Sequence, residues 1–277
     1  MTTQNSVGKS PPITPEEPGI TFLGTADAFN AGGSANSCYW VNDSIGHYTI
    51  DFGPTALMKC HEYGCDLSTL DLILITHLHG DHIGGLPMLL LHLTYDIERT
   101  RPLYIVGPRA TEPFIEQLWQ GTYPSTIKKG LPFDIRYIHW DAEAAITVCN
   151  RSIKSIKAVH DPEAQAHSLR IEGPDYSLAI SGDTGWQSEL IALSKDADVF
   201  ICESTNLYVG YWGHLSIEEH CRHRESLKPK QLILSHLSTA ARARAVELSQ
   251  AHQWTVAYDG MRLSLSRANH ASRKVAL

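Results

Sequence analysis

The chain has 277 residues, which is enough for one or two domains with a substantial hydrophobic core. Its formal net charge of -7 at pH 7 argues against a protein that binds polyanions over its whole surface. The charge is uneven, because residues 221–277 carry ten Lys and Arg residues against three acidic ones. This basic part is either a set of solvated helix faces or a basic rim beside an anionic substrate.

The cysteines and the apolar segments of the chain indicate the cellular compartment to expect for this protein. The six cysteines are scattered and include no CxxC pair, so neither a disulfide framework nor a structural zinc site is predicted. The N-terminus lacks a signal-peptide pattern, and no apolar run approaches the roughly 20 residues that span a bilayer. We therefore expect a cytoplasmic enzyme with free thiols. Residues 1–18 are expected to form a disordered lead, and residues 268–277 a loose tail.

The first half of the chain predicts mostly strands, with helices between them. Residues 19–53 predict three strands of an opening sheet, and residues 55–64 predict a helix that stops at a glycine. The apolar run from residue 70 predicts a strand buried on both faces, which ends where a histidine cluster begins. Three elements follow in order: a helix over 84–99, a strand over 101–108 and a helix over 110–123.

The second half predicts a mostly antiparallel sheet and then strands that alternate with helices. The antiparallel strands are predicted over 133–140, 145–150, 151–160, 167–173 and 176–183. Buried strands over 198–205 and 230–238 alternate with helices over 188–197, 216–229 and 240–252. Ser216 and Glu219 form an S-x-x-E capping box, and residues 254–265 predict a hairpin around Asp259 and Gly260. No linker or repeat interrupts this order, so we predict a single α+β domain over residues 19–267, made of two packed β-sheets with helices outside.

The segment THLHGDHIGG, residues 76–85, holds an unusual cluster of His77, His79, Asp81 and His82. Side chains two positions apart share a face, so His77 and His79 point the same way, while Asp81 and His82 turn toward a neighbouring position. The glycines of the segment let the backbone bend tightly. Imidazole and carboxylate groups are ligands of transition metals, so this loop is predicted to serve two adjacent metal ions.

Four ligands cannot complete two metal sites, and the remaining candidates lie just past the ends of buried strands. His160 ends the run SIKSIKAVH, Asp183 ends YSLAISGD, and His236 ends KQLILSH. Each follows an apolar run and opens into a loop, as a shared site requires. The sequence thus predicts seven metal ligands.

Several motifs, in order along the chain, resemble those of one superfamily. LGTADAFNAGGSANSCYWV, TIDFGPT, THLHGDHIGGLPMLL and PLYIVGP resemble its opening loop, first aspartate motif, metal motif and next strand. SGDTG and ICEST…GHLS…LSHLS resemble its later motifs. Over about residues 19–265 the chain resembles the metallo-β-lactamase fold superfamily, and within it the ribonuclease Z-like branch. The resemblance implies a four-layer αββα sandwich, a two-metal site along one edge of the sheets, and a homodimer.

The resemblance also implies how the ligands are divided between the metals. The metals are usually zinc in this superfamily, although His and Asp suit Mn²⁺ and Fe²⁺ as well. Asp51 matches an aspartate that hydrogen-bonds within the scaffold of the metal site, where such a partner fixes the tautomer of a ligand histidine. The implied groups are His77, His79 and His160 for one metal, Asp81, His82 and His236 for the other, and Asp183 as the bridge.

A site with two metals about 3.5–4 Å apart suits hydrolysis by a metal-bridging hydroxide. Asp81 is expected to orient that water or to accept its proton. His214 matches the histidine of the H-S-T segment of the ribonuclease Z-like branch, with Leu215 inserted, and is expected to protonate the leaving oxygen. Glu203 matches the glutamate that pairs with this histidine, and a carboxylate partner keeps an imidazole protonated near neutral pH.

A side chain that protonates the leaving group favours phosphodiesters over lactams or thioesters as substrates, so we expect a phosphodiesterase. Ribonuclease Z carries a tRNA-gripping arm between the positions of His160 and Asp183, but here only 22 residues with one Arg and no Lys lie between them. A small phosphodiester, a cyclic phosphate or a short nucleic-acid end is therefore expected, and tRNA is unlikely as a partner. The alternatives are a ribonuclease Z-type tRNA 3′ endonuclease, a lactonase or thioesterase, and a non-catalytic module. The other histidines have no ligand-like context, although His167 is considered for the mouth of a pocket.

Overall fold

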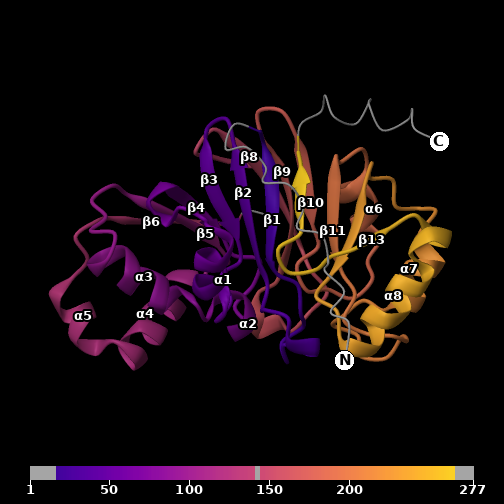
Figure 1. The fold of residues 1–277 in the computed structure, drawn as a ribbon, viewed down its shortest axis with the longest axis horizontal. Coiled ribbons are helices and arrows are strands. Elements are labelled where there is room, and N and C mark those ends of the chain that lie inside the picture. Colours follow the sequence, from indigo (N-terminus) through magenta and orange to yellow (C-terminus); the bar gives the residue numbers. More distant parts are fainter. Residues whose placement is uncertain (1–16, 141–143, 266–277) are drawn as a thin grey trace, which may run out of the picture.

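The computed structural model describes residues 17–140 and 144–265, and within them two β-sheets pack face to face between two layers of helices (Figure 1). The αββα architecture implied by the resemblance is therefore confirmed. The predicted lead and tail lie almost entirely outside the described residues. Among the described residues, no helix has the length and apolar character that crossing a bilayer demands.

The first sheet is built mainly from the first half of the chain. Strands β1 to β3 are antiparallel, β3 to β6 run parallel, and the late strand β14 adds to the free edge of β1. In sheet order the strands are β14 (Arg262–Ser264), β1 (Gly19–Gly24), β2 (Cys38–Asp43), β3 (Gly46–Ile50), β4 (Leu70–Leu74), β5 (Leu103–Gly107) and β6 (Ile135–His139).

The second sheet holds the rest of the strands. Those from β7 to β10 are antiparallel, as the sequence predicts, and those from β10 to β13 are parallel. In sheet order the strands are β13 (Thr255–Val256), β12 (Leu232–Ser235), β11 (Val199–Glu203), β10 (Ser177–Ile180), β9 (His167–Glu172), β8 (Arg151–Lys157) and β7 (Ile146–Val148).

The helices cover the outer faces of the two sheets, and three apolar clusters fill the layers between. Within the described ranges, the helices on the first sheet are α1 (Ala56–Tyr63), α3 (Leu86–Tyr95), α4 (Thr111–Thr122) and α5 (Pro124–Lys129), and the short α2 (Gly80–Ile83) lies at the lower edge in Figure 1. Three lie on the second: α6 (Glu189–Ser194), α7 (Ile217–His223) and α8 (Thr239–His252). The short 3₁₀ turns are Ala31–Gly33, Leu67–Thr69 and Pro162–Ala164. The capping box at Ser216 is confirmed, although α7 ends earlier than predicted.

Two of the predicted strand partners are wrong. Strand β6 leaves the antiparallel run and pairs with β5 in parallel, because helices α4 and α5 form a crossover that returns the chain in the same direction. The predicted hairpin over 254–265 does not form, since β13 pairs with β12 and β14 pairs with β1 in the other sheet. The Asp259 carboxylate accepts hydrogen bonds from the backbone N–H groups of Thr25 and Ala35. These bonds hold the turn where the chain crosses between the sheets.

Candidate metal centre

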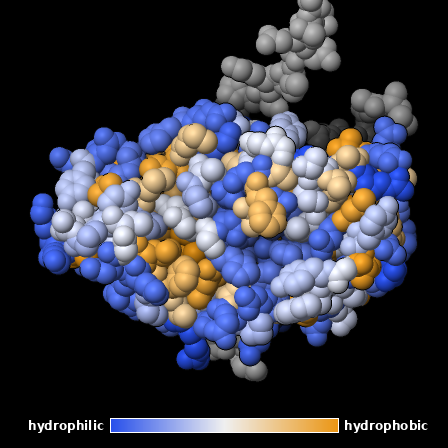
Figure 2. Space-filling view, turned by 90° about the horizontal axis from the view of Figure 1, so that it is seen from below, coloured by the Kyte–Doolittle hydropathy of each residue, from blue (hydrophilic) through white to orange (hydrophobic). Residues whose placement is uncertain are grey.

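The candidate ligands lie at one edge of the sandwich, between the two sheets. His77 and His79 follow β4, and Asp81 and His82 belong to α2, at the lower edge in Figure 1. His160, Asp183 and His236 lie beyond the ends of β8, β10 and β12, so the strand ends of the second sheet face the histidine loop. Figure 2 shows this side of the molecule from below, where hydrophilic and hydrophobic groups lie side by side near the middle of the face.

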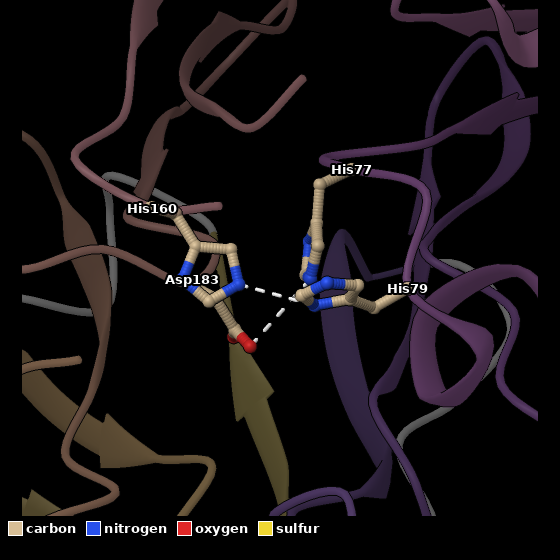
Figure 3. Close-up of side chains that lie close together, drawn as sticks. All are labelled: His77, His79, His160 and Asp183. Carbon is tan, nitrogen blue, oxygen red and sulfur yellow. Dashed lines mark hydrogen bonds and ion pairs between the residues drawn. The ribbon is translucent and has the colours of Figure 1, made fainter. Parts of the chain in front are cut away.

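One group of ligand atoms comes from His77, His79, His160 and Asp183, which point toward one another across the gap between the sheets (Figure 3). Nδ1 of His79 lies 3.1 Å from Nε2 of His160. Nε2 of His77 lies 3.6 Å from Oδ2 of Asp183. All four ligand atoms lie within 4.8 Å of one another, so a single ion could contact all of them.

A second group comes from Asp81, His82, Asp183 and His236, and it shares Asp183 with the first. Nε2 of His82 lies 3.3 Å from Nε2 of His236, and the same His82 atom lies 3.2 Å from Oδ2 of Asp81. The Asp183 oxygens lie 3.4 Å from His82 and 3.6 Å from His236. The structure thus brings together all seven residues that the sequence singled out, in the two groups that the resemblance implies.

The chemistry of these atoms fits a divalent cation. Nε2 of His77 and Oδ1 of Asp183 are buried, and neither has a hydrogen-bond partner in the described part of the chain. Burial, followed by the charge of His82, holds the pKa of His77 well below its usual range, so its imidazole is neutral and has a free lone pair. Burial alone would raise the pKa of Asp183, but the nearby His236, His82 and His77 outweigh it and keep the carboxyl ionised. Unpartnered buried acceptors grouped with further imidazole and carboxylate side chains fit a cation, so this is a candidate divalent-metal site.

Asp51 and Thr76 orient two of the histidines by contacting Nδ1 of each imidazole ring. Oδ2 of Asp51 lies 2.7 Å from Nδ1 of His82, and the Thr76 hydroxyl lies 3.1 Å from Nδ1 of His77. Because the Thr76 hydroxyl donates to Asp51, it accepts the proton of His77 Nδ1. The neutral imidazole of His77 therefore presents an unprotonated Nε2 to the site, and Nε2 of His82 also faces the site because its Nδ1 is held by Asp51.

Thr205 and the carbonyl of Gly213 do the same for the ligands from the second sheet. The Thr205 hydroxyl donates to the His236 carbonyl and lies 2.8 Å from Nδ1 of His236, from which it accepts. Nδ1 of His160 donates to the Gly213 carbonyl over 2.6 Å. Sequence reasoning missed both residues, because their contacts are made by a loop distant in the chain from His160 and His236.

The backbone at this edge is also unusual. Asp51 and His236 both adopt left-handed conformations, with φ of 56° and 55°, at the ends of their strands. Residues other than glycine seldom hold this conformation unless the surrounding contacts fix it. Gly85 is needed for close approach rather than for a tight bend, since a Cβ there would collide with the carbonyl of Gly53. Gly80, by contrast, has open space around it.

His214 and Glu203 lie beside the second metal group. Nδ1 of His214 lies 2.9 Å from Oε1 of Glu203 and 3.9 Å from Oδ2 of Asp183. Burial lowers the pKa of His214, but the hydrogen bond and charge of Glu203 outweigh it and raise the pKa to about 9. The side chain is 18% exposed, so a protonated imidazole sits at the surface of the site.

Glu203 itself is buried and held by the backbone. Its two carboxylate oxygens accept hydrogen bonds from the N–H groups of Thr184 and Thr205. Nε2 of the buried His220 lies 2.8 Å from the Glu203 carbonyl, a contact that the sequence did not reveal. The inserted Leu215 packs into the apolar cluster under the helices of the second sheet. The insertion therefore leaves the pairing of His214 and Glu203 intact.

The segment between His160 and Asp183 contains the short turn Pro162–Ala164 and strands β9 and β10. A single short connection joins those two strands, as Gly173 and Tyr176 close it with a backbone hydrogen bond. All 22 residues are therefore used by the sheet and its connections, and no arm extends from them.

Up to residue 265, where the description of the chain ends, the basic residues of the C-terminal part are largely paired within the fold. Arg222, Lys230 and Arg244 form ion pairs with carboxylates. Arg224 and Arg242 donate to backbone carbonyl groups. These contacts favour helix faces over a basic rim beside the site.

Comparison with known proteins places this site in a family. The family model described as "Anti-Pycsar protein Apyc1" matches residues 19–256. Anti-Pycsar protein Apyc1 of a Paenibacillus species is 30% identical over 188 residues, which cover 62% of this chain and 69% of that protein. Ribonuclease Z of Staphylococcus haemolyticus is 25% identical over 283 residues, covering 83% of this chain and 91% of the relative.

A solved structure supports the fold independently. The short form of human tRNase Z superposes with a TM-score of 0.71 at 22% identity, over 89% of this chain and 99% of that one. The predicted resemblance to the ribonuclease Z-like branch is therefore confirmed. The chain belongs to the anti-Pycsar protein Apyc1 family, and it is a metal-dependent hydrolase with the metallo-β-lactamase fold.

Proposed function

We propose that this protein is a dinuclear metal-dependent phosphodiesterase that acts on a small phosphodiester, a cyclic phosphate or a short nucleic-acid end. The single observation that carries the proposal is the His214–Glu203 pair at 2.9 Å, directly beside the candidate ligands. Hydrolysis of a phosphodiester expels an alkoxide, which needs a proton as it leaves. The names of the relatives, ribonuclease Z among them, agree with phosphodiester chemistry.

The ligand sets follow from the two groups of atoms. His77, His79 and His160 would hold one metal ion, and His82, His236 and Asp81 the other. Asp183 belongs to both groups and would bridge them. Bound in this way, two divalent ions, zinc by preference, supply an activated water and neutralise the charge that develops on the phosphate.

The remaining steps belong to side chains of this chain. Burial alone would raise the pKa of Asp81, but His82 and His236 outweigh it and hold the carboxyl far below its usual range, so it remains an acceptor. It can therefore orient the attacking water or accept its proton. His214, held by Glu203 and protonated at neutral pH, would donate to the leaving oxygen.

Metal content is the first test of this proposal. Protein purified without chelator is expected to carry close to two equivalents of metal per chain, because seven convergent ligands are present. Removing the metals is expected to lower the Tm, since ions that bind only the folded state stabilise it by mass action. Elemental analysis and a thermal scan measure both quantities. A metal content that stays near zero after reconstitution with Zn²⁺, Mn²⁺ or Fe²⁺ would contradict the proposal.

A substrate panel then separates the phosphodiesterase from a lactonase or thioesterase. We expect the metal-loaded enzyme to hydrolyse bis(p-nitrophenyl) phosphate and nucleoside 2′,3′-cyclic phosphates. A phosphomonoester, a lactone and a thioester serve as the comparison substrates. Preferred turnover of the lactone or thioester would transfer the proposal to carbonyl chemistry.

Precursor tRNA is expected to be a poor substrate, because the segment between His160 and Asp183 forms only a turn and two strands. Cleavage of a labelled precursor is measured beside a short single-stranded oligonucleotide as control. Efficient, accurate 3′ processing at nanomolar enzyme would instead favour the tRNA endonuclease. In that case the activity should fall steeply with salt, as phosphate contacts require.

The homodimer implied by the resemblance also stays a proposal. Met88 and Tyr95 of helix α3 are 40% and 54% exposed and line an apolar groove with Leu57 and Leu91. Light scattering of the purified chain measures its mass directly.

A further inference from the structure

A cavity of about 590 Å³ opens beside the candidate metal centre. It lies where the loop after β5 faces the chain between β8 and β9, and its size is within the range of small-molecule pockets. His160, a candidate ligand, forms part of its wall, so the cavity and the metal centre share a residue. An occupant of the cavity would therefore lie next to the group being hydrolysed.

The cavity is cationic in a protein whose net charge is negative. Arg109, from the loop after β5, and Lys157, from the end of β8, both line it with exposed side chains. Within residues 17–140 and 144–265 neither side chain forms an ion pair, whereas Arg101, Arg151 and Arg170 each do. Two unpaired cations from separate elements form an attractive site for an anion.

One carboxylate, that of Asp161, also lines the cavity, but other groups engage it. Its oxygens accept a hydrogen bond from the N–H of Glu163 and lie 3.5 Å from Nε2 of His79. These contacts direct the Asp161 charge toward the metal group. They leave Arg109 and Lys157 available to a ligand.

The walls of the cavity are fixed before any ligand arrives. Gln165 holds a left-handed conformation with φ of 50°, and its side-chain oxygen accepts from the N–H of Ala110, next to Arg109. Nδ1 of His167 donates to the Gln165 carbonyl, and the indole N–H of Trp140 donates to the carbonyl of Ile75. The bond between Ala110 and Gln165 ties the loop after β5 to the segment before β9, so a bound anion would meet a prepared site.

We propose that Arg109 and Lys157 bind a second phosphate of the substrate, one that is not hydrolysed. This inference rests on the proposed phosphodiesterase function and names its substrate class. The preferred substrates are then diesters or cyclic phosphates of nucleotides that carry a further phosphate, such as a 5′-phosphorylated end. Apolar side chains of the cavity, including Trp140 and Ala158, would contact the nucleoside between the two phosphates.

The test uses two pairs of substrates that differ by a single phosphate. The pairs are uridine 2′,3′-cyclic phosphate with or without a 5′-phosphate, and the dinucleotide UpU with or without a 5′-phosphate. For the metal-loaded wild type, the 5′-phosphate should lower KM by about 10- to 100-fold, the usual strength of one or two charge-assisted hydrogen bonds. The values of kcat should be similar within each pair.

The variants assign this effect to the two residues. Arg109→Ala and Lys157→Ala should each remove part of the preference, and the double variant should remove all of it without raising KM for the unphosphorylated substrates. Arg109→Lys should restore part of it. Lys154→Ala is the matched control, because Lys154 is an exposed lysine on the same strand but does not line the cavity. Equal metal content and Tm among the variants would exclude damage to the fold.

Three results would overturn the inference. The first is a wild type that does not distinguish the substrates of a pair, as expected if the cavity binds only the base. The second is a preference that survives in the double variant. The third is an equal loss on both members of a pair. Failure to hydrolyse either diester, in contrast, would refute the proposed function itself.

Discussion

Asp183→Ala is expected to abolish binding at both metal positions and to lower kcat by about 10³-fold or more, because bound metals contribute several kcal/mol to the stabilisation of charge. The carboxylate belongs to both groups of ligand atoms, and its oxygens lie 3.4 and 3.6 Å from His82 and His236. Without this carboxylate, no shared negative charge would offset the repulsion between two divalent cations. Elemental analysis should therefore show well below one equivalent of metal.

Asp161→Asn is the matched control for this variant. Its carboxylate lies 3.5 Å from Nε2 of His79 but belongs to neither group, so the metal content should stay near that of the wild type. A variant of Asp183 that retains two equivalents of metal would show that the bridge is supplied by something else. The assignment of the two groups would then be wrong.

His214→Ala is expected to leave the metal content unchanged while lowering kcat by about 10²–10⁴-fold, the usual contribution of a general acid. The loss should be small for a p-nitrophenyl diester, whose leaving group departs readily as an anion. It should be large for a ribose leaving group. An equal loss for good and poor leaving groups would remove His214 from the acid role and favour the carbonyl hydrolases.

The pH dependence gives a second test of this role. Because His214 acts when protonated, the rate should fall as the pH rises through its pKa, which Glu203 raises to about 9. Bound metal ions oppose this increase, since they are cations near Asp183, so the alkaline limb should lie below pH 9. Glu203→Gln removes the charge that favours the imidazolium, and the limb should move to lower pH. A limb that does not move would contradict the pairing.

The sequence predicted the candidate metal ligands better than the residues that contact them or the pairing of the strands. His77 to His82 could be found because they follow a buried strand at short spacing, and His160, Asp183 and His236 because each ends an apolar run. Such signals are local. They needed no knowledge of which strands pair.

Features that depend on partners distant in the chain could not be predicted in this way. The segment around Asp259 and Gly260 has the local pattern of a hairpin, but each flanking strand pairs at the edge of a different sheet. Thr205 and Gly213 have ordinary sequence contexts, and only the folded chain places them against His236 and His160. The same holds for the cavity, whose two cations, one in the loop after β5 and one at the end of β8, lie 48 positions apart in the chain.

Because Gly213 and His214 are adjacent, metal binding at the first position and protonation of the leaving group depend on the same short stretch of chain. The carbonyl of Gly213 holds His160, and the next side chain is the proposed acid, so a single peptide unit connects the first metal position to the leaving group. By the reciprocity of linked equilibria, if an ordered His160 favours the aligned His214, then an aligned His214 favours the ordered His160 by the same free energy. Loss of the first metal would therefore weaken the alignment of the proton donor, although Glu203 still contacts it. Partly loaded protein would then hydrolyse its substrate more slowly than the fully loaded enzyme.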